Sequence, residues 1–293
     1  MEKVLIIGGG EIGQAVAQLL VAVTPEVFDK DPVRNNLDRP LSEAVANADA
    51  IFLCLPTKVL STVVSDILPH LTEATPVVTL SKGLGASGDF VWEILEESLP
   101  QASHVVLGGP MLAEEIKAGR YAAAVVAAVD PDARQRVINV FSGTKLITES
   151  SDDPAGTAVC GVLKNIYTVG LAMADGLNLG DNTRGLLLNR ALVEMAEIVV
   201  SFGGQVETAY SLAGLGDLVA TSASVHSKNV AAGQSLARGD TALVESEGSL
   251  ALPLLWPRLE AKRDHLPFMA AIADISLNHS NPKNVFTDLF VTL

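Results

Sequence analysis

The sequence predicts an α/β fold, with an N-terminal Rossmann-type domain built on a doubly wound parallel sheet and a C-terminal all-α domain. Three observations predict it. The first half alternates short β-rich runs with amphipathic segments, as βαβ units do. A glycine motif follows the first of these runs and opens a helical segment. From Ala155 onward the apolar residues recur at helical spacing, and no comparable strand pattern returns.

The expected strands are short runs rich in β-branched and apolar residues. Several are apolar throughout, as strands covered by helices on both faces should be. We expect strands at Lys3–Ile7, Glu26–Asp29, Ala50–Leu55, Pro76–Leu80, His104–Leu107, Ala122–Val129 and Lys145–Thr148. Amphipathic segments between them predict helices at Glu11–Val21, Ser61–Leu71 and Phe90–Leu99.

The pattern changes at the polar stretch 149–154, which ends in Pro154. Polar, proline-containing stretches are typical of connections between structured segments. We therefore expect a Rossmann-type domain over residues 1–150 and a helical domain over residues 151–293. Asn182 is the expected N-cap of the second long helix. The helices of the second domain are expected at 155–176, 183–203, 227–237, 249–263 and 267–278.

Composition excludes several classes of protein. Hydrophobic residues make up 48% of the chain and charged residues 18%, which is ample material for a folded core. Charges, glycines or prolines interrupt the apolar runs before the ~20 residues that a membrane helix needs. The first residues run directly into a strand, so we expect a cytoplasmic protein without a signal peptide or membrane insertion. A net charge of −14 would repel nucleic-acid phosphates, which argues against nucleic-acid binding.

The glycine motif reads Gly8-Gly9-Gly10-Glu11-Ile12-Gly13, a G-x-G-x-x-G pattern between a strand and a helix. In such a motif the first glycine allows a tight turn, the second lets the backbone approach a pyrophosphate, and the third lets the helix pack on the strand. The helix N-terminus then faces the phosphates with free N–H groups. Glu11 is unusual here, because it places a carboxylate beside the expected pyrophosphate.

The second strand ends at Asp29, where a ribose-binding acid belongs in a dinucleotide fold. This position favours NAD, while Lys30 and the nearby Arg34 are placed to hold the additional phosphate of NADP. Asp29 also suits a turn-capping role before Asp31-Pro32. We expect NAD or NADP as the cofactor, with a slight preference for NAD.

Several polar residues fall where a ligand is expected. Lys82 and Gly109 follow two strands, at the carboxyl edge where open α/β sheets bind ligands. Lys164-Asn165 lies in a strongly apolar helix, where a lysine is costly unless it has a partner or a task. Asp217 is placed to orient or charge-pair such a lysine, and Thr221 lies one helical turn further on. The segment Ser227-Lys228-Asn229 offers a cation and two hydrogen-bonding groups for a phosphate.

These segments, taken in order, resemble the NAD(P)-dependent glycerol-3-phosphate dehydrogenase family. The resemblance extends from the N-terminus to about residue 239 and is specific as an ordered set. It implies an active site between the two domains and the reversible reduction of dihydroxyacetone phosphate to sn-glycerol 3-phosphate, a precursor of phospholipids. The segments that carry it are Gly10–Gly13, Ser81–Leu84, Gly109–Glu115, Leu163–Asn165, Gly176–Asn182 and Gly214–Leu218.

The resemblance also implies roles for individual residues. Lys164 corresponds to the general acid/base, with Lys82, Asn165, Asp217 and Thr221 completing the catalytic set. Residues implied to contact substrate are Lys82, Gly109, Met111, Lys164, Asp217, Ser227, Lys228 and Asn229. Residues implied to contact the cofactor are Gly8, Gly10, Glu11, Ile12, Gly13, Asp29, Lys30, Lys82, Ala113, Lys228 and Glu247.

Two positions depart from the family pattern and bear on the substrate. Lys228 stands where the family has arginine, and a lysine offers a point charge instead of a bidentate fork. Met111 stands where the family has serine or threonine, and it lacks the hydroxyl donor. We expect a small anionic substrate, a phosphorylated triose, and no metal. Two alternatives remain: a dehydrogenase of similar build for another hydroxy or oxo acid, related to ketopantoate reductase, or a cofactor-binding protein without activity.

Two further expectations concern the helical domain. Its apolar helix faces suit a homodimer. Arg190 and Glu194, four residues apart on a predicted helix, are expected to form a surface ion pair of little energetic weight.

Overall fold

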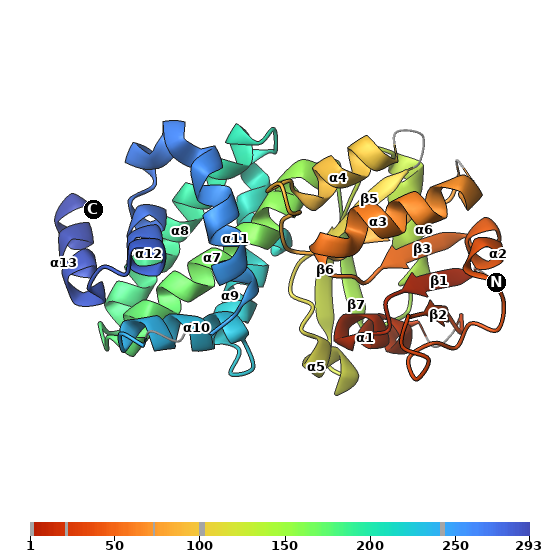
Figure 1. The fold of residues 1–293 in the computed structure, drawn as a ribbon, viewed down its shortest axis with the longest axis horizontal. Helices are drawn as coiled ribbons and strands as arrows, with labels where there is room; N and C mark the ends of the chain where they lie inside the picture. The colour runs from red at the N-terminus through yellow and green to blue at the C-terminus, as the bar shows by residue number, and fades with distance from the viewer. Residues whose placement is uncertain (1–2, 21–22, 73, 100–102, 241–243) are drawn as a thin grey trace. The chain divides into compact units, whose positions relative to one another are not determined.

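A computed structural model describes residues 3–20, 23–72, 74–99, 103–240 and 244–293 of the chain (Figure 1). The chain forms two compact units, Met1–Ala158 and Val159–Leu293, here called the sheet unit and the helical unit. The division falls within helix α7 (Pro154–Gly176). The domain boundary placed at residue 150 from sequence stays a prediction. The expected end of the first helix, at Val21, lies outside the described residues.

A seven-stranded sheet forms the centre of the sheet unit, with the strand order β2-β1-β3-β4-β5-β6-β7. Both β2 and β3 pair with β1 in parallel, and Ile6 lies opposite Phe52 in the register of β1 with β3. The predicted α/β class is confirmed. The strands are β1 (Val4–Ile7), β2 (Glu26–Phe28), β3 (Ala50–Leu53), β4 (Val77–Thr79), β5 (His104–Gly108), β6 (Ala122–Ala127) and β7 (Leu146–Ser151).

Helices cover both faces of this sheet, which explains why its strands are apolar throughout. On one face, side chains such as Ile6 and Phe52 pack with residues of α1 and α6 in a single buried cluster. On the other face, α3 and α4 lie over the sheet (Figure 1), and strand residues such as Leu5 and Ile51 are fully buried. The helices of this unit are α1 (Glu11–Leu19), α2 (Leu41–Ala46), α3 (Leu60–Ile67), α4 (Val91–Ser98), α5 (Ala113–Lys117) and α6 (Pro131–Val140).

One pairing of this mostly parallel sheet differs, because β5 and β6 are antiparallel. β7 is parallel to β6, so the last two strands run opposite to the first five. The connection from β5 to β6 contains only α5, a helix of five residues. At 1.5 Å per residue such a helix spans roughly 8 Å, too little to return along a strand of about 17 Å, so the chain re-enters the sheet from the same edge.

The helical unit is organised around α7, which is buried along nearly its whole length. A Cβ on Gly233 would overlap the Val169 carbonyl group, so glycine there lets α10 approach α7 closely. The remaining helices are α8 (Asp181–Ser201), α9 (Asp217–Ala223), α10 (Lys228–Ala237), α11 (Glu247–Leu255), α12 (Pro267–Asn278) and α13 (Pro282–Thr292).

Two expectations for these helices need correction. Gly180, not Asn182, is the N-cap of α8, and its φ of +85° belongs to the region that favours glycine. The helix expected at 249–263 is two elements, α11 and a 3₁₀ segment at Trp256–His265. Pro257 lies at the start of the second element, where its missing N–H and ring prevent α11 from continuing.

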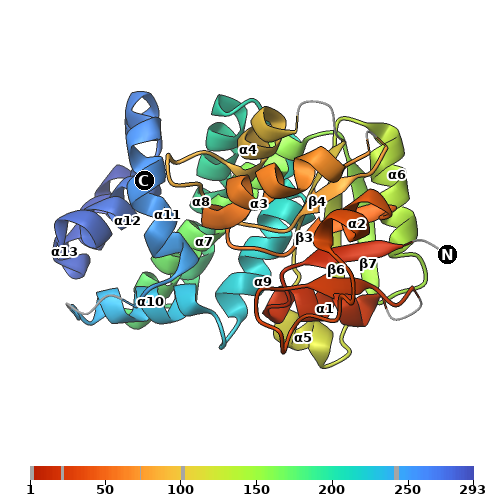
Figure 2. The same cartoon turned by 45° about the vertical axis from the view of Figure 1, so that its right-hand side comes forward.

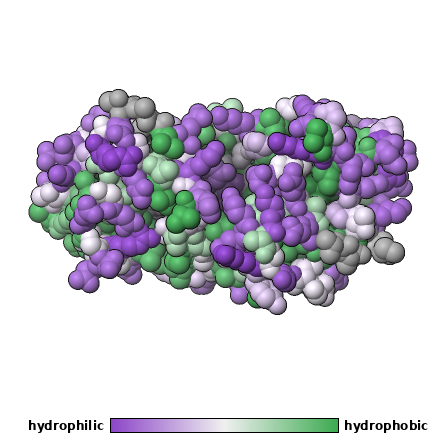
Figure 3. Space-filling model, turned by 90° about the horizontal axis from the view of Figure 1, so that it is seen from below, coloured by the Kyte–Doolittle hydropathy of each residue, from purple (hydrophilic) through white to green (hydrophobic). Residues whose placement is uncertain are grey.

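Among the described residues, α7 is long and apolar enough to cross a membrane by length and composition. The apolar window of α7 is completely buried inside the folded chain. Its apolar character is thus accounted for by its position at the centre of the helical unit. The face shown in Figure 3 presents a mixture of hydrophilic and hydrophobic residues.

Candidate active site

The glycine turn joins β1 to α1, and its three motif glycines serve different purposes. Gly8 has a φ of +105°, and a Cβ there would overlap the carbonyl oxygen of Cys54. A Cβ on Gly13 would overlap the Gly8 carbonyl oxygen. A Cβ on Gly10 would meet nothing within 4 Å. Packing therefore requires glycine at two positions, while Gly10 leaves open space beside the N-terminus of α1, where a phosphate can approach.

Asp29, directly after β2, is bound to this turn. Its Oδ2 accepts a hydrogen bond of 2.6 Å from the Gly9 N–H, and its Oδ1 accepts one of 2.9 Å from the Asp31 N–H. These bonds, that from Asp31 foremost, hold the pKa of Asp29 below its ordinary value. The turn-capping role is thus present. Each carboxylate oxygen retains a second acceptor site, which leaves Asp29 able to bind a ribose hydroxyl as well.

Two cations lie close to Asp29 along the chain. Lys30 is exposed. Arg34 forms an ion pair of 3.4 Å with Asp31, and its backbone carbonyl lies 2.8 Å from where a Gly9 Cβ would stand. The segment after β2 therefore packs directly against the glycine turn.

Glu11, the first residue of α1, forms an ion pair and hydrogen bond with Lys117 at the end of α5. The ammonium group of Lys117 holds the pKa of Glu11 below its ordinary value. Ile12 and Ala113, near the starts of these two helices, both pack on the apolar cluster of the sheet. Sequence reasoning identified Glu11 but missed Lys117.

Lys82 and Gly109 are brought together at the carboxyl edge of the sheet. Lys82 Nζ donates a hydrogen bond of 2.9 Å to the Gly109 carbonyl oxygen. Gly109 has a φ of +131°, and a Cβ there would lie 2.9 Å from the Ala123 carbonyl oxygen. Met111 is only 6% exposed and belongs to the apolar cluster of the sheet. The predicted contact of Met111 with substrate stays a prediction.

In the helical unit, Lys164, Asp217 and Thr221 form a buried triad. Lys164 Nζ donates a hydrogen bond of 2.8 Å to Thr221 Oγ1 and lies 3.3 Å from Asp217 Oδ1. Thr221 Oγ1 donates in turn to Asp217 Oδ1 at 3.1 Å. All three residues are at most 6% exposed. The ammonium group is thus held by a charge and a hydroxyl.

Asn165, the next residue of α7, begins a second network. Its Nδ2 donates to Glu247 Oε2 at 2.8 Å, and its Oδ1 accepts from Asn229 Nδ2 at 2.8 Å. The backbone N–H of Gly248 donates to Asn229 Oδ1 at 2.9 Å. This network links α7 with the starts of α10 and α11. Asn229 is buried, and its amide atoms are engaged with protein groups.

The N-terminus of α10 carries the other two residues of the predicted phosphate-binding segment. Ser227 is the N-cap, and its hydroxyl accepts a hydrogen bond of 3.4 Å from the Val230 N–H. Lys228 is the first residue of the helix and is exposed. A helix N-terminus with an adjacent lysine is suited to an anion.

The predicted ion pair between Arg190 and Glu194 is confirmed, but its expected position at the surface is wrong for Glu194. Its side chain is completely buried, with Oε1 at 2.9 Å from Arg190 Nε. It also accepts hydrogen bonds from the Tyr167 hydroxyl and from the backbone N–H groups of Phe268 and Met269 at the start of α12. Burial raises the pKa of Glu194, against the effect of these donors. The sequence signal was the apolar spacing of α8, which places Glu194 on the buried face.

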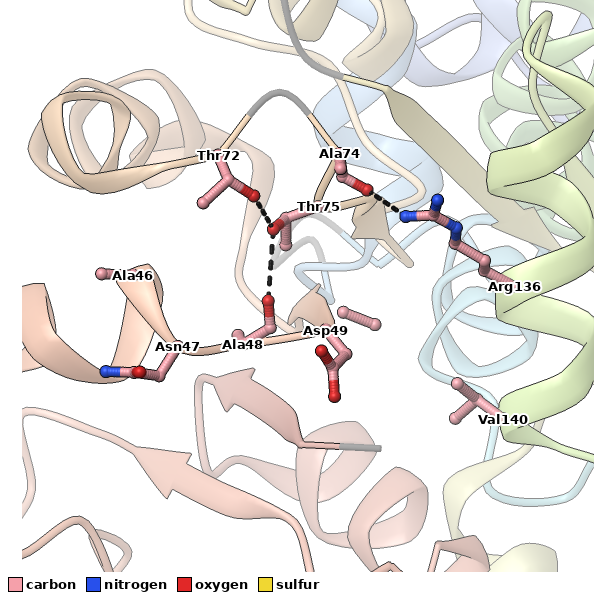
Figure 4. Close-up of a pocket in the computed structure, with 10 residues that line it drawn as sticks. Ala46, Asn47, Ala48, Asp49, Thr72, Ala74, Thr75, Arg136 and Val140 are labelled. Carbon is pink, nitrogen blue, oxygen red and sulfur yellow. Dashed lines mark hydrogen bonds between the residues drawn. The ribbon is translucent and has the colours of Figure 1, made fainter. Parts of the chain in front are cut away.

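A pocket of about 650 Å³ lies elsewhere in the sheet unit (Figure 4). Asp49 precedes β3 and Thr75 precedes β4, so the pocket lies at the amino ends of these strands. Arg136 lines it and donates a hydrogen bond of 2.6 Å to the Ala74 carbonyl oxygen. Because open α/β sheets bind ligands at the carboxyl ends of their strands, we assign the candidate site to Lys82, Gly109 and the glycine turn.

Comparison with known proteins identifies the family of this chain. Residues 30–134 match the family model described as NAD-dependent glycerol-3-phosphate dehydrogenase N-terminus, and residues 153–287 match the one described as its C-terminus. A glycerol-3-phosphate dehydrogenase [NAD(P)+] of Pseudomonas syringae pv. tomato is 33% identical, over 92% of this chain and 89% of its own length. Another, from Deinococcus radiodurans, is 38% identical over 83% of this chain and 73% of its own length.

Among solved structures, glycerol-3-phosphate dehydrogenase from Coxiella burnetii superposes with a TM-score of 0.86 at 24% identity. That match covers 99% of this chain and 98% of the Coxiella chain. At this identity the match supports the fold, while the sequence relatives establish the family.

Proposed function

The chain belongs to the NAD-dependent glycerol-3-phosphate dehydrogenase family, and we propose that it interconverts dihydroxyacetone phosphate and sn-glycerol 3-phosphate with NADH or NADPH. In the cell this reaction would supply the backbone of glycerophospholipids. The observation that carries the proposal is the buried ammonium group of Lys164, which Asp217 and Thr221 hold at 3.3 and 2.8 Å.

Lys164 is the proposed general acid and base. As the substrate carbonyl is reduced, negative charge develops on its oxygen, and an ammonium group there stabilises that charge and delivers a proton. Asp217 and Thr221 position the ammonium group. In the direction of oxidation, the neutral amine accepts the proton from the hydroxyl group.

The glycine turn is the proposed dinucleotide site. The open space at Gly10 and the free N–H groups at the start of α1 fit a pyrophosphate. When bound, the dinucleotide supplies or accepts the hydride. Asp29 is proposed to bind the ribose and Lys82 to contact both cofactor and substrate, while Ala113, Lys228 and Glu247 complete the cofactor contacts implied by the family.

The substrate is proposed to be a small phosphorylated triose. Its phosphate would meet Ser227 and Lys228 at the N-terminus of α10, where helix dipole and lysine both favour an anion. Asn229 is engaged by Asn165 and Gly248, so we propose that it orients Asn165 in addition to any substrate contact. The buried Met111 is proposed to act through the backbone of its loop, next to Gly109.

We also propose that the protein acts in the cytoplasm, without membrane insertion, as a homodimer. The buried position of α7 supports the absence of a membrane span. Leu186, Val193 and Val200, seven residues apart on α8, are 48%, 36% and 54% exposed and form an apolar stripe suited to a second copy. Val193→Glu should then yield monomers in sedimentation velocity, whereas an unchanged oligomer would exclude this stripe as the interface.

The deciding experiment is the initial rate of NADH and NADPH oxidation with dihydroxyacetone phosphate, beside ketopantoate and other oxo acids. Turnover restricted to dihydroxyacetone phosphate supports the proposal and shows that Lys228 and Met111 are tolerated. Activity on another oxo acid alone would assign a different substrate to the same fold. Cofactor binding without turnover on any of them would contradict enzymatic function.

A further inference from the structure

Glu11 places a negative charge where the proposed function needs a positive environment. It is the first residue of α1, directly after Gly10, and its side chain is 70% exposed. A pyrophosphate at this helix N-terminus would be repelled by an uncompensated carboxylate there. The chain therefore needs a cation close to Glu11 if the turn is to bind a dinucleotide well.

Lys117 supplies that cation from a different part of the sequence. It is the last residue of α5, which lies beside α1 in both ribbon views (Figures 1 and 2), and its Nζ is bonded to Glu11 Oε2. A second bond, from Gln18 Nε2 to the Lys117 carbonyl oxygen at 3.1 Å, fixes the backbone of Lys117 to the same helix. Arg34 adds positive charge from the segment that packs on Gly9.

An exposed ion pair usually contributes little to stability. If this pair served only to join α1 to α5, removal of either partner would have the same small effect. If the pair instead sets the charge at the glycine turn, the two substitutions should have opposite effects on cofactor binding, because the two partners carry opposite charges. Loss of Lys117 would leave the turn more negative, and loss of Glu11 would leave it more positive.

We propose that Lys117 is a positioning residue that neutralises Glu11 and so keeps the glycine turn receptive to the pyrophosphate of the dinucleotide. The proposal rests on the proposed function insofar as it assumes that a nicotinamide dinucleotide binds at this turn. It adds a determinant of cofactor affinity on α5, outside the glycine motif.

The test is the Kd of NADH for the purified chain at low ionic strength. The fluorescence of the bound nicotinamide measures this Kd. Lys117→Ala should weaken binding about two- to fivefold, and Glu11→Gln should tighten it or leave it unchanged. The double variant should bind like the wild type. The differences should shrink at 1 M salt, where the Debye length falls to about 3 Å.

Lys145→Ala is the matched control, because Lys145 contacts Gly119 and Tyr121 and its loss changes net charge equally. It should leave Kd unchanged. Equal weakening in Glu11→Gln and Lys117→Ala would overturn the proposal in favour of a structural tie. Weakening in Lys117→Ala that Glu11→Gln does not rescue would overturn it in favour of direct phosphate contact by Lys117. A wild type that binds no NADH would instead refute the proposed function.

Discussion

The helical unit buries two acidic residues in different ways. Asp217 contacts the ammonium group of Lys164 and accepts a hydrogen bond from the hydroxyl of Thr221. Glu194 accepts bonds from Arg190 and Tyr167, and also from two backbone N–H groups of α12. Backbone donors cannot move without unwinding the helix, whereas a lysine can give up a proton. The carboxylate of Glu194 binds the N-terminus of a helix, whereas that of Asp217 contacts the lysine proposed as the acid and base.

The largest expected effect is on catalysis, at the lysine that Asp217 contacts. Lys164→Met removes the proposed acid/base and should lower kcat about 10²–10⁴-fold, the usual contribution of general acid–base catalysis. The Kd of NADH should stay close to that of the wild type. Steady-state rates and fluorescence titration measure the two quantities.

The matched control for this change is Lys164→Met/Asp217→Asn. The single variant leaves Asp217 buried without its cation, which costs stability. The double variant should recover that stability and remain inactive. Recovered activity, or loss of NADH binding in a folded single variant, would contradict the role given to Lys164.

Substitution of Glu194 should instead lower stability and leave catalysis unchanged. Glu194→Gln keeps the shape of the side chain but turns an amide NH₂ toward donors that need an acceptor. The free energy of unfolding should fall by about 3 kcal/mol, because buried donors lose their partner. Urea denaturation measures this, and the kcat of the folded fraction should not change. Glu197→Gln, which removes a partly exposed acid 3.8 Å from His265, should cost little. A large loss of kcat in folded Glu194→Gln would contradict a purely structural role for Glu194.

Two buried threonines of the helical unit differ in whether their hydroxyl groups are bonded. Thr221 joins Lys164 to Asp217, whereas the hydroxyl of Thr168, also completely buried, has no hydrogen-bond partner among the described residues. Thr221→Val should lower kcat about tenfold, as loss of one hydrogen bond to a charged group predicts. Thr168→Val should leave kcat unchanged and raise the unfolding midpoint slightly. Equal effects of the two substitutions on kcat would contradict the triad.

The sequence predicted these features unevenly, for physical reasons. Lys164 drew attention because a lysine in an apolar helix is costly without a partner, and the family resemblance implied its role. The spacing of α8 indicated that Glu194 is buried, but not what it binds, since its backbone partner Phe268 lies 74 residues away in the sequence. The Glu11–Lys117 pair spans 106 residues and was missed for the same reason. The direction of β6 was also missed, because the apolar pattern of a strand does not record its direction.

The smallest expected effect concerns Asp29, which backbone N–H groups hold as they hold Glu194. Asp29 is exposed enough to meet a ligand, so a backbone-held acid here need not be purely structural. Asp29→Asn removes the charge that disfavours the 2′-phosphate of NADP and weakens acceptance from a ribose hydroxyl. The ratio of kcat/KM for NADH over NADPH should fall about fivefold, with the unfolding midpoint almost unchanged. Lys30→Ala should move that ratio in the other direction. If Asp29→Asn leaves this ratio unchanged while Lys30→Ala changes it, cofactor selection belongs to Lys30. Asp29 would then be a turn cap only, with a structural role like that of Glu194.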